Sequence, residues 1–495
     1  MQESFINGLE TESLPIIAFS GYLTLVIVIG IYATRFSSAG INAFFIGGRK
    51  MGRIVVALSA VVSGRSAWLL LGVTGMAYKM GASAVWAVVG YIITEMLLFM
   101  FYARRLRRFA GVYDAITIPD FFAIRFNDTD SKLRITTAVI ILIFMISYVS
   151  AQFVGGGKAF AASFQIEQNT GILITAVIVL FYTMFGGFLA VSLTDLFQAV
   201  FMIVALTLLP VIAAIDRGGL TKVLNELQNI DNSMIDPFAL TAGMAVGFLG
   251  IGLGSPGNPH IIARYMSIND PEQLRVSAVI GTIWNVIMAW GALFIGLIGR
   301  VYYPDLNMLP AGDTENLYPV LAMRHLHPIL FGVVIASIFA AIMSTADSQL
   351  LVAASSIVRD IFQKILHRDS DIPEKILVRY SRIAVFLLVV LALMLGFMLQ
   401  NIVFWLVLFA WAGLGAALGP TSILALYWKG ASRSGVFWGL ITGTLVTLIW
   451  YFIGPLKTAL YELVPAFALS MVVTILVSRY TKKPDRVDEM FRIMK

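Results

Sequence analysis

The sequence predicts an all-α integral membrane protein, and two observations support that prediction. Of the 495 residues, 59% are apolar and only 13% are Asp, Glu, Lys or Arg, with a mean hydropathy of +0.86. Soluble domains carry roughly 25% charged residues, so this chain lacks the charge to cover a soluble surface of its size. Apolar runs of about 20 residues, the length that crosses a hydrocarbon core, recur along the chain. The runs are continuously apolar, which favours helices over a transmembrane barrel.

Thirteen segments have the length and composition of a membrane-spanning helix. They are residues 14–34, 54–78, 83–103, 134–162, 170–188, 190–214, 238–255, 274–300, 328–363, 381–400, 402–427, 434–453 and 458–478. Segment 328–363 exceeds one straight span and is expected to extend into water. The chain is expected to form one membrane domain over residues 1–495. In it, 14–34 is an extra N-terminal helix and 434–478 supplies two extra C-terminal helices.

The distribution of Lys and Arg predicts the orientation of the chain. If the N-terminus lies outside and thirteen spans alternate, 27 of the 35 Lys and Arg residues fall in the cytoplasmic segments. That asymmetry favours an outside N-terminus and a cytoplasmic C-terminus, in a multi-pass protein of the plasma membrane. It also explains the sequence pI of 9.4 through contact with anionic lipid headgroups, so no nucleic-acid partner is expected.

Two of the predicted spans contain residues that interrupt a helix. The second span carries Ser-Gly-Arg-Ser at its middle, residues 63–66. The seventh has five glycines and two prolines within residues 247–259, so a continuous helix is not expected there. Transporters built from inverted repeats place their binding sites at such breaks, in matching helices of the two halves. The breaks lie five spans apart, which predicts two inverted five-helix repeats, residues 54–214 and 238–427.

Few ionisable residues lie well inside the predicted spans, where they are functional candidates. There are four of them: Arg65, Glu95, Asp195 and Asp347. Around Asp347, the residues Ser344, Thr345 and Ser348 project hydroxyls over about one helical turn. A sodium ion binds hydroxyl, carboxylate and carbonyl oxygens, and an unwound helix supplies the carbonyls. This stretch favours a cation site; back-bonding of each hydroxyl to its own helix is the alternative.

Four stretches carry motifs that are specific when taken together. They read Gly-Gly-Phe-Leu-Ala-Val-Ser-Leu-Thr-Asp-Leu-Phe-Gln at 186–198, Pro-His-Ile-Ile-Ala-Arg-Tyr at 259–265, Ala-Ala-Ile-Met-Ser-Thr-Ala-Asp-Ser-Gln-Leu-Leu at 340–351 and Ala-Trp-Ala-Gly-Leu-Gly-Ala-Ala-Leu-Gly-Pro at 410–420. On these motifs, almost the whole chain resembles the sodium:solute symporter family and is closest to its sodium/proline symporter branch. The resemblance implies the leucine-transporter-type fold, alternating access and a binding site near the middle of the membrane.

The resemblance also implies positions for the ions and the solute. A sodium site would use the backbone carbonyls of Val62, Arg65 and Ala341 and the hydroxyls of Ser344 and Thr345. A second cation or proton site would use Asp195, Ser344, Asp347 and Ser348. Solute contacts would come from Trp68, Tyr148, Ile251 and Ser255. At the last two positions the proline branch has aromatic residues.

Arg65 departs from the pattern of the proline branch, as does Gly64, which stands where that branch has an Asp important for sodium. A guanidinium stays charged in proteins. Within about 4 Å of a sodium ion it would repel the ion by about 4 kcal/mol at an effective dielectric of 20. Three interpretations follow. Arg65 replaces the sodium ion and pairs with Asp347, Asp195 or Glu95; it binds the carboxylate of the solute as a planar fork; or it pairs with Glu95 and sodium binds as usual.

These features favour a secondary active transporter that moves a small solute, an amino acid or an organic carboxylate, with a coupled cation. A sodium-independent or proton-coupled carrier, with Arg65 in place of sodium, is one alternative. A transporter-derived membrane sensor is another, although the roughly fifteen residues after Tyr480 supply no signalling domain. The sequence has no cluster of His, Asp and Glu that would indicate an enzyme. It also has no nucleotide-binding loop that would indicate an ATP-driven pump. Sodium ion is a possible ligand, and no organic cofactor or protein partner is expected.

Overall fold

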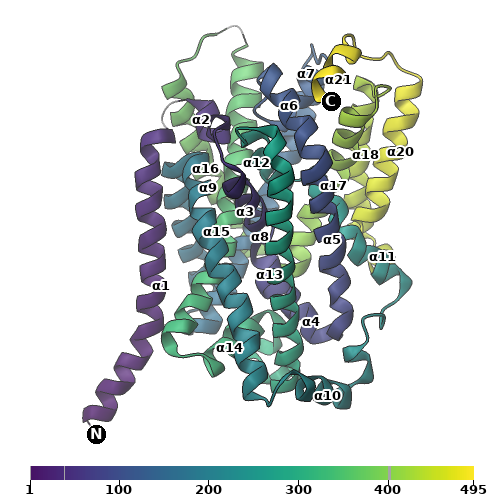
Figure 1. Cartoon of the computed structure of the whole chain (residues 1–495). Helices are drawn as coiled ribbons and strands as arrows, with labels where there is room; N and C mark the ends of the chain where they lie inside the picture. Colours follow the sequence, from purple (N-terminus) through teal and green to yellow (C-terminus); the bar gives the residue numbers. More distant parts are fainter. Residues whose placement is uncertain (1, 38–39, 369, 400–402) are drawn as a thin grey trace.

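The computed structural model describes the backbone of residues 2–37, 40–368, 370–399 and 403–495, and the side chains of these residues except 2–12, 33–37 and 185. Within those ranges every regular element is a helix, and one isolated bridge joins Met51 to Ile268. Figure 1 shows a bundle in which α1 (Gln2–Ser37) begins at one end and α21 (Val487–Met494) lies at the other. We call these the N-terminal end and the C-terminal end of the bundle.

Nine helices in the described part of the chain are long and apolar enough to cross a membrane. They are Ser13–Tyr32, Trp68–Tyr113, Lys132–Phe164, Gly186–Asp216, Pro271–Tyr302, Pro328–Leu366, Glu374–Met398, Val403–Tyr427 and Arg433–Phe452. Shorter apolar helices accompany them: Arg53–Ser63, Gln168–Met184, Ala242–Gly257 and Leu463–Arg479. The all-α membrane architecture is therefore confirmed, while the number of thirteen spans stays a prediction. The predicted limits at residues 400 and 402 lie outside the described residues.

Three helices form the most buried part of the bundle: α8 (Lys132–Phe164), α15 (Pro328–Ser355) and α17 (Val403–Tyr427). Around them lie α13 (Leu274–Tyr302), α16 (Glu374–Met398), α18 (Arg433–Phe452) and α20 (Leu463–Arg479). α6 (Ala103–Tyr113) is the end of the long helix Trp68–Tyr113. Short helices lie between the long ones: α2 (Ile41–Ile46), α7 (Ile118–Arg125), α10 (Leu220–Ile230), α14 (Leu317–His325) and α19 (Gly454–Ala459).

Glycines in the left-handed region divide two of the long helical stretches. α9 (Gln168–Asp216) contains Gly187 at φ 59°, so it consists of two helical segments, in agreement with the two spans predicted there. Gly81, at φ 65°, lies between α4 (Thr74–Met80) and α5 (Val85–Leu97). A side chain at φ values of this kind is strained, and glycine avoids that cost where the chain must turn between helices.

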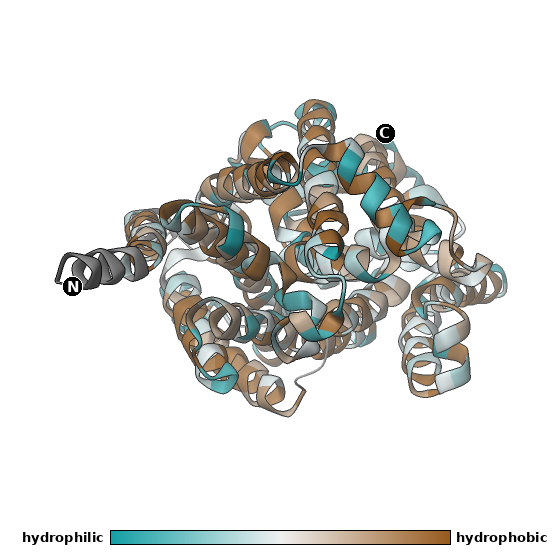
Figure 2. Cartoon of the chain, turned by 90° about the horizontal axis from the view of Figure 1, so that it is seen from below, coloured by the Kyte–Doolittle hydropathy of each residue, from teal (hydrophilic) through white to brown (hydrophobic). Residues whose placement is uncertain are grey.

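The outer surface of the bundle is apolar. Along one face of α16, the side chains of Ile383, Phe386, Leu387, Leu391 and Met394 are exposed at helical spacing. Figure 2 shows the same apolar character on other helices at the periphery. An apolar face of this length is unfavourable in water but matches the hydrocarbon of a bilayer, in which the helical backbone satisfies its own polar groups.

At the N-terminal end, a buried ion-pair cluster joins three segments. Lys158 Nζ of α8 donates to Asp313 Oδ2 at 2.7 Å and to Glu315 Oε2 at 2.6 Å. The Glu315 carboxylate also accepts the backbone N–H groups of Val403 at 2.9 Å and Phe404 at 2.8 Å. These N–H groups belong to the first turn of α17, where the helix dipole favours an anion. The cluster therefore holds α8 and the N-terminus of α17 together.

A second ion-pair cluster lies toward the C-terminal end. Arg134 Nη1 of α8 lies 2.6 Å from both Asp120 Oδ1 and Asp360 Oδ1, and Arg359 Nε lies 3.1 Å from Asp120 Oδ2. Burial opposes the ionisation of Asp120, but the guanidiniums of Arg359 and Arg134 outweigh it and lower the pKa of that carboxyl. The cluster ties α7 and α8 to the continuation of α15.

Candidate cation and solute site

The first predicted break is present between α3 (Arg53–Ser63) and α4. The helix stops at Ser63, and Ser66 adopts φ 52°, a left-handed conformation that is uncommon for a residue other than glycine. Side chains replace the missing helical hydrogen bonds. The Ala67 N–H donates to Gln152 Oε1 at 3.0 Å, and the Trp68 N–H donates to its neighbour Ser66 Oγ at 3.0 Å. Such local strain at a supported break is typical of functional sites.

The second predicted break follows α11 (Ala242–Gly250). The chain continues as a 3-10 helix, Ile251–Gly257, and returns to an α-helix at α12 (Pro259–Ser267). The span predicted to end at residue 255 therefore continues after its break as α12. A Cβ on Gly254 would lie 1.9 Å from Trp411 Nε1, so glycine permits the close approach of α17.

The residues predicted for the sodium site come together where α15 packs on the first break. The Ser344 hydroxyl lies 3.4 Å from the Val62 carbonyl oxygen and 3.2 Å from that of Ala341. Thr345 Oγ1 donates to the Ser63 carbonyl oxygen at 3.0 Å. All of these groups are buried. The set consists of neutral hard oxygens, the donor chemistry that sodium uses, and it is supplied by two different helices.

Arg65 lies in the same break, but its side chain is bound elsewhere. Its guanidinium forms an ion pair with Glu95 of α5, and both side chains are 1% exposed. Arg65 Nε donates to Asn285 Oδ1 at 2.7 Å, and Asn285 Nδ2 donates to Glu95 Oε2 at 2.5 Å. The Arg65 Cζ atom lies 3.3 Å from the centre of the Tyr91 ring, within the range of a cation–π contact. This geometry matches the pair with Glu95, which two of the three interpretations share: replacement of the sodium ion and ordinary sodium binding.

The residues predicted for the second cation site surround a different guanidinium, that of Arg264. Asp195 Oδ2 accepts from Ser59 Oγ at 2.5 Å and from Arg264 Nη2 at 3.3 Å. Arg264 also donates to Ser348 Oγ, which lies 3.0 Å from Asp347 Oδ1. Sequence reasoning missed Arg264 as a site residue. The hydropathy pattern placed the end of the seventh span at residue 255, so Arg264 was assigned to a cytoplasmic segment. The motif at 259–265 contains Arg264 and could have indicated it.

The residues predicted to contact the solute line an aromatic region beside both breaks. The ring centres of Trp68 and Tyr91 lie 6.1 Å apart, and those of Tyr148 and Trp411 lie 6.5 Å apart. Trp411 Nε1 donates to the Ile251 carbonyl oxygen at 2.8 Å, so it binds the second break directly. Tyr91 and Trp411 were absent from the predicted site, because each lies on an unbroken helix.

Several buried polar atoms in this region have no hydrogen-bond partner among the described residues. They include Trp68 Nε1, Tyr91 Oη, Gln152 Nε2, Ser255 Oγ and Asn258 Oδ1, and also Arg65 Nη1 and Glu95 Oε1 of the ion pair. Buried polar groups in proteins are nearly always satisfied by protein, water or a ligand. Two of these atoms, Ser255 Oγ and Trp68 Nε1, belong to residues that are predicted to contact the solute. Donors and acceptors flanked by aromatic rings fit a small polar solute with an apolar side.

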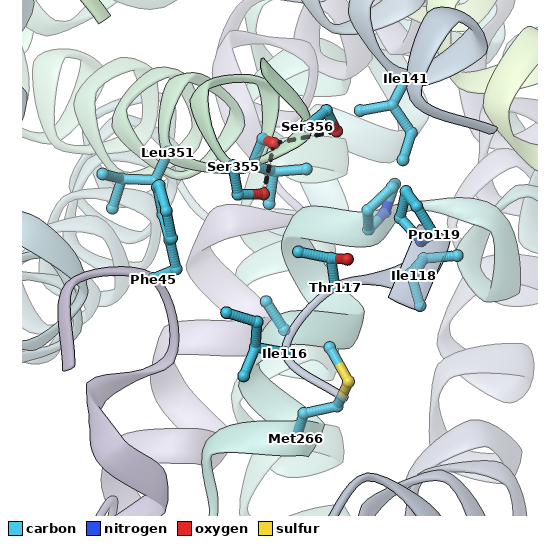
Figure 3. Close-up of a pocket in the computed structure, with 13 residues that line it drawn as sticks. Phe45, Ile116, Thr117, Ile118, Pro119, Ile141, Met266, Leu351, Ser355 and Ser356 are labelled. Carbon is cyan, nitrogen blue, oxygen red and sulfur yellow. Dashed lines mark hydrogen bonds between the residues drawn. The ribbon is translucent and has the colours of Figure 1, made fainter. Parts of the chain in front are cut away.

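Two cavities of the described structure touch the second broken helix, one beside α11 and the other beside α12. The larger, of about 580 Å³, lies between α4, α11, α17 and residues 457–462, and Ile251 is among its lining residues. The smaller, of about 20 Å³, is lined by Thr117 and Met266, with Ser355 and Ser356 across from them (Figure 3). It has room for about one water molecule. The larger cavity therefore offers the wider approach to the second break.

Two broken helices that meet around buried oxygens and aromatic rings define a secondary transporter. The family model described as the sodium:solute symporter family matches residues 44–443. The chain belongs to the sodium:solute symporter family. It is 38% identical over 472 residues to Sodium/proline symporter 2 of Staphylococcus saprophyticus, covering 94% of this chain and 92% of that protein. It is 37% identical over 483 residues to the osmoregulated proline transporter OpuE of Bacillus subtilis, covering 97% of each.

A solved structure shows the fold. This chain matches a sodium-coupled sialic acid symporter, in a substrate-bound outward-open state with a novel sodium site, at a TM-score of 0.81 and 17% identity. The match covers 95% of this chain and 98% of the other. The leucine-transporter-type fold is thereby confirmed. As a member of this family, the protein is a multi-pass membrane transporter that couples solute to a cation, not an enzyme. Neither the sodium-independent carrier nor the membrane sensor is favoured by these relatives.

Proposed function

We propose that this protein carries a small amino acid, with proline as the first candidate, into the cell together with sodium. The observation that supports it most directly is the contact of α15 with the first break, where Ser344 and Thr345 meet the carbonyls of Val62 and Ser63. The relatives named as proline transporters supply the candidate solute. The pairing of Arg65 with Glu95 supports sodium coupling, because it neutralises the charge that would repel the ion.

In this mechanism the sodium ion links α3 to α15. It is held by the carbonyls of Val62, Arg65 and Ala341 and by the hydroxyls of Ser344 and Thr345. The link stabilises the outward-open state, and its loss lets the first broken helix move and open the cytoplasmic path. Coupling requires that sodium bind one state better than the other, since equal binding to both would shift nothing. The two broken helices belong to the two proposed five-helix repeats, residues 54–214 and 238–427.

The solute binds between the two breaks, next to the sodium site. Trp68 and Tyr148 provide its aromatic walls, and Ile251 and Ser255 line the second break. Ile251 also lines the 580 Å³ cavity, which we take as the entry path from outside. Ser255 Oγ and Trp68 Nε1, both buried and without a protein partner in the described chain, are the polar contacts offered to the solute.

Sodium-driven proline uptake is the expected activity of the purified protein. In proteoliposomes, labelled proline should accumulate several-fold when sodium is imposed outside, and no accumulation should occur when choline replaces sodium or when the gradient is collapsed by an ionophore. Accumulation of equal size without sodium, or with a proton gradient alone, would contradict sodium coupling. Sodium dependence with another amino acid in place of proline would retain the coupling and correct only the solute.

The proposed orientation can be tested because the chain has no cysteine. Met308 is 52% exposed between α13 and α14, and the side chain of Lys482 near the C-terminus is 87% exposed. An external N-terminus places Met308 outside and Lys482 in the cytoplasm. In intact cells, a membrane-impermeant maleimide should therefore label Met308→Cys fully and Lys482→Cys only after permeabilisation. The reverse pattern would show that the topology is inverted. Labelling of both positions in intact cells would contradict an odd number of membrane crossings between Met308 and Lys482.

A further inference from the structure

Arg264 occupies the centre of the predicted second cation site. It lies on α12, directly after the second break, and is 2% exposed. Its guanidinium contacts three other helices. Nε donates to Ser59 Oγ of α3 at 3.0 Å, Nη2 donates to Asp195 Oδ2 of α9 at 3.3 Å, and Nη2 also donates to Ser348 Oγ of α15. Nη1 donates to the His260 carbonyl within α12 at 2.7 Å.

Two of the oxygens that a second sodium ion would need are thus already bound by N–H donors. Asp195 Oδ2 and Ser348 Oγ both accept from Arg264, and the guanidinium holds a permanent positive charge beside them. A sodium ion placed among the same atoms would lose these ligands and meet a like charge. The guanidinium supplies planar N–H donors that match carboxylate and hydroxyl oxygens in a buried position. Its positive charge does there what the charge of a bound cation would do.

The guanidinium of Arg264 balances one of the two buried carboxylates of the cluster. Asp195 and Asp347 supply two carboxylates, both 0% exposed, and Arg264 supplies one guanidinium. The outer oxygens, Asp195 Oδ1 and Asp347 Oδ2, have no hydrogen-bond partner in the described chain. These two oxygens lie outside the hydrogen bonds of Arg264, and removal of its side chain would add Asp195 Oδ2 and Ser348 Oγ to them. Removing its side chain would therefore expose a set of buried anionic and hydroxyl oxygens.

We propose that Arg264 is a tethered cation that fills the second cation site, so that this protein binds sodium only where α15 meets the first break. The inference rests on the proposed sodium coupling. It assigns Arg264 a role in ion stoichiometry and not in contact with the solute. It also explains how α12, the inner half of the second broken helix, is held to α3 and α9: the ion pair takes the place of an exchangeable ion.

The test is the number of sodium ions bound at saturation, measured by equilibrium dialysis of purified protein against ²²Na⁺, with choline balancing the ionic strength. The wild type should bind one sodium. Arg264→Ala should bind two, and the Hill coefficient for sodium-driven uptake should rise from about one toward two. Arg264→Lys, which keeps a tethered cation, should stay at one. Asp195→Asn combined with Arg264→Ala should return to one, because the second site loses its carboxylate.

Arg125 provides the matched control. It is buried at 0% exposure on α7 and bonds to the Ala425 carbonyl at 3.1 Å, away from both breaks. Arg125→Ala should leave the sodium number at one. A folded Arg264→Ala protein that still binds one sodium overturns the inference, as does a wild type that binds two. If Arg264→Ala does not fold, the wild-type and Arg264→Lys numbers decide. Binding of no sodium to the wild type overturns instead the proposed function.

Discussion

Glu95→Gln is expected to destabilise the protein by about 3–5 kcal/mol, because it leaves the Arg65 guanidinium buried without its counter-charge. Both side chains are 1% exposed, so water cannot replace the lost partner. Asn285 would still accept from Arg65 Nε, but an amide oxygen does not neutralise a cation. The loss should appear as a lower melting temperature of the purified protein in detergent. In whatever fraction folds, sodium affinity should also fall, since the uncompensated charge belongs to the break that supplies the proposed sodium ligands.

The double variant Arg65→Met with Glu95→Met separates charge balance from packing. Replacing a buried ion pair by apolar side chains of similar volume is often neutral, so its melting temperature should return close to the wild-type value. Glu272→Gln is the control for an exposed pair. Glu272 is 52% exposed and bonds to Arg108 at 2.6 Å, and its loss should cost under about 1 kcal/mol. Equal destabilisation by the double and the single variant would contradict the charge-balance explanation.

The membrane architecture could be predicted because it depends on composition and spacing alone. Runs of apolar residues specify helices in a bilayer, whatever their neighbours. Glycine and proline specify breaks through local backbone energetics, so interruptions were correctly expected within residues 63–66 and 247–259, although the α-helix continues to Gly250 in the second. The lengths of the elements were harder. A hydropathy window stops where polar residues begin, so α12 was not recognised as the continuation of the seventh span.

The partners of buried charges could not be predicted, because they depend on which helices pack together. Three carboxylates were candidates for Arg65, and only the packing of α5 and α13 beside the first break brings Glu95 and Asn285 to it. Asp195 was expected to hold a cation or a proton, and a guanidinium from α12 lies on it instead. Both pairs join residues more than 25 positions apart in the sequence, and neither follows from helical periodicity.

The two guanidiniums together explain how the proposed sodium coupling is compatible with so much buried charge. Arg65 is balanced by Glu95, and Arg264 by Asp195, so each cation has its own anion. The neutral oxygens between Ser344 and the first break then remain available to an ion that arrives and leaves. A fixed ion pair does not exchange with solvent during transport. The exchangeable site must instead bind its ion with an affinity low enough to allow release.

Thr345→Ala is the variant expected to change sodium dependence most directly. Thr345 Oγ1 lies 3.0 Å from the Ser63 carbonyl oxygen and is one of two hydroxyls in the proposed site. Loss of a hydroxyl that binds an ion costs about 1.4–2.7 kcal/mol, so the sodium concentration for half-maximal uptake should rise roughly 10- to 100-fold. Uptake measured across a series of external sodium concentrations gives this value. Thr345→Ser, which keeps the hydroxyl, should stay within about threefold of the wild type.

The control for Thr345→Ala is a buried threonine that serves only its own helix. Thr447 of α18 is 0% exposed and donates to the Gly443 carbonyl at 2.8 Å, so Thr447→Ala should leave the sodium dependence unchanged. The apparent affinity for solute at saturating sodium should be nearly normal in Thr345→Ala, because the hydroxyl faces the ion. An unchanged sodium dependence in Thr345→Ala, with Thr345→Ser and Thr447→Ala also normal, would remove Thr345 from the sodium site.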